Sequence, residues 1–236
     1  MLTVNRAIWL YTGGIFILGV VMTASTTTAA TISAAVGGVP NNATIYENFD
    51  SLTEKGGTTA NGITVIFSGN ASVAALPNVA GIYASPYISN GNSILFDNFQ
   101  SYGQNKTQYL TTGTGSVTLE LGGYHQYFGL LWGSVDSYNT LSFYDDDSFL
   151  FEFTGSDVNV LANGNQGAAG TFYVNINSDI AFNKVIITSS HYAFEFDNVA
   201  LAEQPLEFPA EVPTPGTLLL LGIGLLMSWI VRQFAR

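Results

Sequence analysis

Between residues 44 and 201, short apolar stretches alternate with polar positions and are separated by turns rich in Gly, Asn, Asp and Ser. A side-chain period of two is typical of strands with one buried face, and no window of this region sustains a helical period. The pattern therefore predicts an all-β fold, an antiparallel β-sandwich of the jelly-roll kind. The expected strands are 44–49, 62–67, 93–96, 117–121, 127–132, 140–144, 149–154, 172–176, 184–189 and 193–201.

Two stretches indicate how neighbouring strands are arranged. The stretch "LSFYDDDSFLFEF" alternates on both sides of three consecutive aspartates, so it predicts a hairpin. The stretch "FGLLWG" is continuously apolar and predicts a central strand covered on both faces. The residues of the hairpin expected to point inward are Leu141, Phe143, Phe149, Phe151 and Phe153.

The first 30 residues have the layout of a secretory signal peptide, expected to be helical. Arg6 precedes an apolar run over residues 7–22, and small residues follow. Cleavage is expected after Ala30, with position 35 as the alternative, and an uncleaved N-terminal anchor is the other interpretation. Signal peptidase and the general secretion machinery are the implied partners. Residues 31–43 are expected to form a linker before the domain at 44–203.

A second membrane segment is predicted at the C-terminal end. Beyond a Pro-rich linker at 204–216, the 15 uncharged residues 217–231 would span about 22 Å as a helix. The hydrocarbon core is about 30 Å thick, and the short fit is accommodated by an interfacial tryptophan and a snorkelling arginine. The basic tail 232–236 is expected to stay cytoplasmic. The residues that mark this anchor are Thr217, Trp229, Val231, Arg232 and Arg236.

The same region resembles a known sorting signal. Its order of Pro-x-Pro, a threonine, a short Leu- and Gly-rich helix and a basic end is similar to the PEP-CTERM signal of Gram-negative bacteria. The motif is formed by Val212, Pro213, Thr214 and Pro215, with Thr214 where the family usually has Glu. The resemblance implies processing here by an exosortase, a membrane-embedded cysteine protease. It also implies transient anchoring in the inner membrane and then delivery to the cell surface or extracellular matrix; a permanent membrane anchor is the alternative.

The charge of the chain excludes one class of partner. Its net charge is −11, and all 17 acidic residues lie between Glu47 and Glu211, where the only basic residues are Lys55, Lys106 and Lys184. Such a surface repels phosphate backbones, so nucleic acid is not expected as a partner. Cations and neutral glycans suit it better. The absence of cysteine also excludes disulfides and thiolate chemistry.

Carboxylates at both ends of the domain are candidates for a structural calcium site. The stretches "IYENFDSL", "FGLLWGSVDSYNTLSFY" and "FEFDNVAL" resemble exosortase-dependent surface proteins whose β-sandwich is similar to carbohydrate-binding modules. In lectin-like sandwiches of this kind, the first and last strands lie side by side, and calcium joins them through oxygen ligands. Glu47, Asp50 and Asp197 are the expected ligands, and solvated loop and edge residues are the alternative.

The sequence contains no nucleophile elbow, zinc-protease motif or phosphate-binding glycine loop, so catalysis is not expected. A glycosidase needs two carboxylates about 5 to 10 Å apart, and 17 acids guarantee accidental pairs. Tyrosines in or beside polar loops could instead hold sugars. These residues are Tyr83, Tyr87, Tyr102, Tyr109, Tyr124, Tyr138 and Tyr192.

The first hypothesis is therefore an exported, non-enzymatic surface or matrix protein. A carbohydrate-binding module that adheres to extracellular polysaccharide is the alternative, and a glycan-degrading enzyme is the third.

Overall fold

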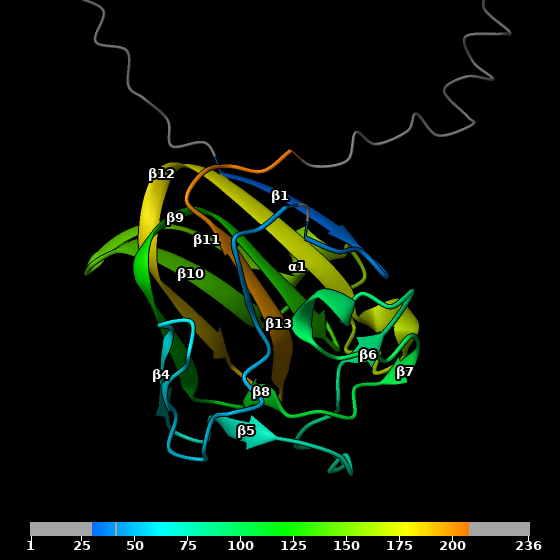
Figure 1. Cartoon of the computed structure of the whole chain (residues 1–236). Helices are drawn as coiled ribbons and strands as arrows, with labels where there is room; N and C mark the ends of the chain where they lie inside the picture. The colour runs from blue at the N-terminus through cyan, green and yellow to red at the C-terminus, as the bar shows by residue number, and fades with distance from the viewer. Residues whose placement is uncertain (1–29, 41, 208–236) are drawn as a thin grey trace, which may run out of the picture.

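The computed structural model describes residues 30–40 and 42–207, which form a mostly β structure built on a large antiparallel sheet (Figure 1). Within this part of the chain the sheet has 11 strands, and a further pair, β6 and β7, stands apart. The strands are β1 (Ala30–Ala35), β2 (Ile45–Glu47), β3 (Gly57–Thr58), β4 (Thr64–Ser68), β5 (Ser72–Ala74), β6 (Tyr87–Ile88), β7 (Gly103–Gln104), β8 (Tyr109–Thr112), β9 (Ser116–Gly133), β10 (Asn139–Asp145), β11 (Ser148–Thr154), β12 (Phe172–Ser189) and β13 (Phe194–Ala202). The short helices are η1 (Ile94–Phe96), α1 (Gly155–Val158) and η2 (Ala168–Gly170).

Two long strands, β9 and β12, form the centre of the sheet. They have 18 residues each and pair antiparallel from Phe172 opposite Trp132 to Thr188 opposite Ser116. The register shifts between Asn177 and Lys184, and this irregularity divides the pairing into two halves. One half is flanked by β1 and β13, and the other by β10 and β4.

The sequence predicts each of these strands as two short ones, and the structure corrects this. On β9 the apolar pattern is interrupted by two glycines and "YHQ", and on β12 by "NSDI". The backbone stays extended across these positions because β9 and β12 are paired both before and after the irregularity. Pairing with a neighbouring strand therefore overrides the local break in hydrophobic pattern.

The two halves of the sheet share one core. Phe128, on the first half, meets Phe143 of β10 on the second half with ring centroids 5.5 Å apart in an edge-to-face arrangement. Trp132 and Phe194 stack at 4.2 Å, and both are fully buried. Because residues from both halves belong to the same cluster, the sheet bends so that its halves pack against each other.

The outer face of β9 and β13 is also covered. The chain between β5 and β8, residues 75–108, lies over it and is here called the covering segment. A second apolar cluster joins them, in which Ile88 and Phe96 of the covering segment pack with Tyr127 and Leu131 of β9. Side chains of β9 thus alternate between two cores, which confirms the expectation that this strand is buried on both faces.

The predicted hairpin is present as β10 and β11, with one error in the expected inward set. Leu141 and Phe143 are fully buried, and they lie opposite Phe153 and Phe151, which pack against the core. Phe149 lies opposite Tyr144 and is 55% exposed, so its inward assignment is wrong. The reason is a register shift after Phe143 that changes the face on which the following residues lie.

Two other expectations fail locally. The strand expected at 93–96 is the helix η1, which the covering segment uses to place Phe96 in the second core. Residues 31–43 were expected to be a linker, but β1 begins at Ala30 and pairs with β12 over six positions. Ile32 and Ala34 pack against the main core, so the start of this segment belongs to the sheet.

Both ends of the described chain lie at the same end of the molecule (Figure 1). No helix within residues 30–40 and 42–207 is long and apolar enough to cross a membrane. The predicted signal peptide before Ala30, the sorting motif and the helix at 217–231 lie outside the described residues.

Candidate functional site

A polar pocket lies at one end of the sheet, where four connections converge. Its volume is about 210 Å³. It is formed by the covering segment, the β9–β10 loop, the β11–β12 connection and the β12–β13 loop. Backbone hydrogen bonds join two of these loops, since Val135 N donates to Gly170 O and Gly164 N to Val135 O, each at 3.0 Å. The lining residues are Gly81, Ile82, Tyr83, Ser134, Asp136, Tyr138, Asn163, Gly164, Gln166, Tyr192, Ala193 and Glu195.

Glu195 is the buried carboxyl group of this pocket, with 2% of its surface exposed. The apolar side chains of Phe194 and Phe196 face the main core. Because successive side chains of a strand point to opposite faces, Glu195 lies on the other face, under the covering segment. Its Oε1 accepts a hydrogen bond from Ala84 N at 2.7 Å, and its Oε2 accepts one from Ser134 Oγ. Burial raises the pKa of Glu195 to about 7, against the opposing effect of these hydrogen bonds.

Asp136 is the second carboxyl group. Its Oδ2 accepts a hydrogen bond from the Tyr138 hydroxyl at 2.6 Å, and burial raises its pKa above the usual value. The Tyr138 hydroxyl also lies 3.1 Å from the carbonyl oxygen of Tyr192, so this tyrosine connects two of the loops. Negative charge on Asp136 also contributes to the raised pKa of Glu195, which places the two carboxyl groups in one electrostatic environment.

Glycines allow the loops to close tightly around Asp136. A Cβ atom at Gly155 would collide with the backbone carbonyl oxygen of Asp136. Gly164 has a φ of +67°, and a Cβ there would come within 2.6 Å of Asp136 Oδ2. Both positions therefore require glycine, one for close approach and one also for its left-handed backbone.

Tyrosine rings form the aromatic part of the pocket. Tyr192 is 45% exposed, and its hydroxyl accepts a hydrogen bond from Asn70 Nδ2 at 2.6 Å. Tyr138 lies against His191, with ring centroids 4.9 Å apart, and Tyr83 lies edge-to-face with Tyr109 at 6.3 Å. Three of the seven predicted loop tyrosines thus line one site, a selection that the sequence did not make.

The predicted calcium ligands lie around a different part of β13, with Asp197 on β13 itself, Glu47 at the end of β2 and Asp50 just beyond it. The expectation that the opening and closing strands are neighbours is confirmed, because β2 pairs with β13 and Glu47 lies opposite Val199. Asp197 is fully buried, and the charges of Asp50 and Glu47 add to burial in raising its pKa. The three carboxyl groups are therefore close enough to interact electrostatically.

These carboxylates are mostly held by neutral donors. Glu47 accepts hydrogen bonds from Phe49 N at 2.9 Å and from Asn61 Nδ2 at 3.0 Å. Asp50 Oδ1 accepts one from Gln108 N at 3.1 Å, and Asp197 Oδ2 accepts one from Asn105 Nδ2 at 2.7 Å. The site is thus a set of separately stabilised carboxylates.

Two neighbouring residues of this region, Asp197 and Asn198, have buried polar atoms without a hydrogen-bond partner among the described residues. Within the described part of the chain, Asp197 Oδ1 and both polar atoms of the Asn198 side chain have no hydrogen-bond partner. Carboxylate and amide oxygens are the ligands that calcium prefers, so these two residues fit such an ion. No three His, Cys, Asp or Glu side chains of the described residues come together as a metal site, and calcium stays a prediction.

Sequence reasoning did not single out Glu195, Asp136 or Asn198 as site residues. An available signal for Glu195 and Asn198 was the run "FEFDN", where polar residues interrupt a strand that ends the domain. For Asp136, only its position directly after the central strand marked it.

The described chain is thus a mostly β protein with a polar pocket at one end of its sheet. No family model, no curated protein and no solved structure matches the chain.

The buried position of Glu195 predicts a pH-dependent stability. A glutamate titrates near 4.5 in the unfolded chain and about 7 here, so the folded state binds the proton more tightly and loses stability as pH rises between these values. Glu195→Gln keeps a neutral group at this position. Between about pH 5 and about pH 8 the wild type should lose about 2 to 3 kcal/mol of unfolding free energy that the variant does not lose, so the difference between variant and wild type should increase by this amount.

Urea denaturation across this pH range measures the difference. Glu152→Gln, on an exposed residue of β11, is the matched control. Equal pH dependence for wild type and Glu195→Gln would contradict the prediction.

The calcium hypothesis predicts ligand-dependent stability. Calcium should raise the melting temperature of chelator-treated protein, because binding to the folded state stabilises it by about 2.7 kcal/mol at a hundredfold excess over Kd. Asp197→Asn should lose this response, and Asp179→Asn, which alters an exposed carboxylate, should keep it. A melting temperature that does not respond to calcium or chelator in the wild type would reject the site.

Proposed function

We propose that the chain is an exported, non-enzymatic surface or extracellular-matrix protein whose β domain binds carbohydrate in the polar pocket. The observation that supports this best is the composition of the pocket. Carboxyl, amide and hydroxyl groups from four loops meet three tyrosine rings, and no Lys or Arg of the described residues lines it. This favours the carbohydrate-binding alternative over a purely structural role.

These groups match the chemistry of a sugar. A pyranose presents hydroxyls that both donate and accept hydrogen bonds, which suits the side chains of Asp136, Asn163 and Gln166. It also has an apolar ring face, which a tyrosine can cover while its hydroxyl stays hydrated. The pocket is smaller than a typical site for a drug-sized ligand, so one sugar unit of a longer polymer is the proposed occupant.

We also propose that the bent sheet is a β-sandwich, of the jelly-roll kind used by carbohydrate-binding modules. The shared core of its two halves supports the two-layer description.

The buried state of Glu195 supports a binding role over a catalytic one. A general acid must reach the leaving group of its substrate. Glu195 is almost fully covered, and both of its oxygens already accept hydrogen bonds from neighbouring groups. A glycan-degrading enzyme is therefore the less favoured proposal.

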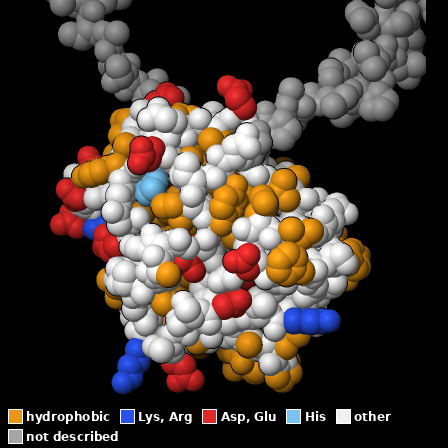
Figure 2. Space-filling model, viewed as in Figure 1, with side chains coloured by type: hydrophobic (Ala, Val, Ile, Leu, Met, Phe, Trp, Pro, Cys, Tyr) orange, Lys and Arg blue, Asp and Glu red, His pale blue; other side chains and the backbone are white. Residues whose placement is uncertain are grey.

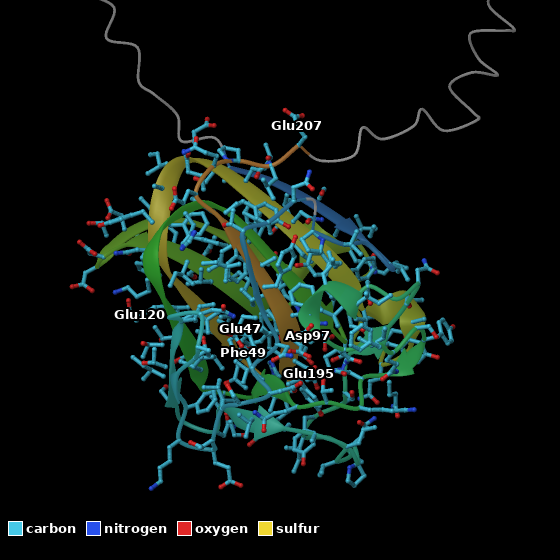
Figure 3. All side chains as sticks on the ribbon, in the orientation of Figure 1. Glu47, Phe49, Asp97, Glu120, Glu195 and Glu207 are labelled. Carbon is cyan, nitrogen blue, oxygen red and sulfur yellow. The ribbon has the colours of Figure 1, made fainter. Side chains whose placement is uncertain are left out.

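Export and sorting complete the proposal. Signal peptidase and an exosortase-type protease are the proposed processing partners, with the membrane as a temporary anchor before release to the surface. The fold is compatible with this order, since Glu195 lies toward the opposite end of the molecule from Glu207 (Figure 3).

Carbohydrate binding predicts a specific loss on truncating a pocket tyrosine. Tyr192→Ala should weaken binding to a retained polysaccharide about tenfold, which corresponds to about 1.4 kcal/mol. Tyr102→Ala removes a similarly exposed tyrosine outside the pocket and should have little effect. A glycan array followed by titration calorimetry measures both.

Two outcomes would contradict this function. Retention on no polysaccharide would leave only the structural role, and hydrolysis of a glycan, abolished by a single Asp or Glu substitution, would indicate an enzyme.

The sorting proposal predicts the ends of the mature protein. Mass spectrometry should find an N-terminus at or before Thr31, because cleavage after position 35 would remove β1 from the sheet. The C-terminus should lie near Pro213 or Pro215. Surface-localised protein that still ends at Arg236 would rule out processing and indicate a permanent anchor.

A further inference from the structure

The two carboxyl groups of the polar pocket lack a fixed cationic partner. Among the described residues, no lysine or arginine lines the pocket, and Lys184 instead pairs with Asp147 at 2.9 Å and Glu120 at 3.8 Å. The charge of His191 acts on Asp136 and lowers its pKa against the larger effect of burial, but His191 does not line the pocket, and its Nδ1 lies 2.9 Å from Ser190 Oγ. On the face shown in Figure 2, lysines lie at the margins while acidic groups also occur within it.

Neutral donors alone hold these carboxyl groups. Glu195 accepts from a backbone N–H and from Ser134, and Asp136 accepts from Tyr138. Such donors stabilise a carboxylate but do not neutralise its charge. Burial of a charge is costly unless an opposite charge is also present. A ligand that carries a cation would supply this opposite charge, and its affinity would increase through a charge-assisted hydrogen bond.

Asp136 and Glu195 both influence the electrostatic potential at Tyr138. Burial and the hydrogen bond to Asp136 raise the pKa of the Tyr138 hydroxyl most, and the negative charges of Asp136 and Glu195 raise it further, which places this tyrosine within the field of both. A cation bound beside Tyr138 would therefore be attracted by Asp136 and, in the fraction of molecules where Glu195 is ionised, by Glu195 as well.

The aromatic rings add a second attraction for a cation. The faces of tyrosine rings attract ammonium groups when these lie within about 6 Å of the ring centre. Tyr83, Tyr138 and Tyr192 line the pocket together with the carboxyl groups. The combination of rings with carboxylates favours an ammonium group, whereas a uronic acid would meet repulsion.

We propose that the pocket selects an amino sugar, with the ammonium group of a 2-amino-2-deoxyhexose beside Asp136 and the tyrosine rings, while the buried Glu195 acts on it only through its charge. This inference rests on the proposed carbohydrate binding and names the class of sugar. The hydroxyls of the same unit bind the amide side chains of the pocket. Free hexosamine units, as in de-N-acetylated hexosamine polymers, are therefore preferred over N-acetylated, neutral or acidic ones.

The test compares three ligands on the full-length chain in mild detergent, by titration calorimetry at neutral pH. These are a glucosamine tetramer, its N-acetylated counterpart and a galacturonate tetramer. The glucosamine tetramer should bind at least about tenfold more tightly than the other two, and added salt should reduce this preference.

Asp136→Asn removes one charge while keeping the shape of the side chain. It should reduce the preference for glucosamine over N-acetylglucosamine about tenfold. Asp97→Asn removes a carboxylate outside the pocket, at a position of left-handed backbone that asparagine tolerates, and should keep the preference. If Asp136→Asn does not fold, the comparison of ligands on the wild type still decides.

The outcomes separate this inference from the proposed function. Equal binding of the glucosamine and N-acetylated tetramers would overturn the selectivity and leave carbohydrate binding intact. Binding of no glycan, amino sugars included, would overturn both. Equally tight binding of a lysine oligomer would show that the pocket selects ammonium groups of peptides, and the amino-sugar proposal would be wrong.

Discussion

The antiparallel pairing of β9 with β12 is the constraint on which the rest of the described structure depends. Each strand has 18 residues, and the irregularity in their register produces two halves that pack together. β13 is added to one half beside β9, and β10 is added to the other half beside β12. The loops that follow β9 and β12 then meet the β11–β12 connection and the covering segment at one end of the sheet, where together they form the polar pocket.

The alternation of side chains along β13 determines which polar groups of this strand are buried. Phe194 and Phe196 are fixed in the main core, so Glu195 and Asp197 lie on the other face. An open face would leave both carboxyl groups in water. Because the covering segment lies over that face, both are buried, and Ala84 and Asn105 of this segment each donate a hydrogen bond to one of them.

Local patterns in the sequence predicted most strands but not their continuity. The alternation around Leu141 and Phe143 indicated the β10–β11 hairpin, and the all-β class follows from such patterns. The unbroken β9 and β12, and the outward Phe149, depend on pairing across the sheet, which no local period contains. The pocket could not be predicted from the sequence for a similar reason. Its residues lie on connections that are far apart in the chain, and only the topology of the sheet brings these connections together.

The free-energy cost of burying Glu195 is itself an argument for function. Its raised pKa means that the charged form is destabilised relative to water, even though both oxygens accept hydrogen bonds. An apolar side chain could fill the same layer without this cost, since neighbouring Leu131 and Ala200 already pack against the covering segment. Perturbed carboxyl groups are concentrated at functional sites, so Glu195 beside a pocket, with a second raised pKa at Asp136, marks this end of the sheet as the candidate site.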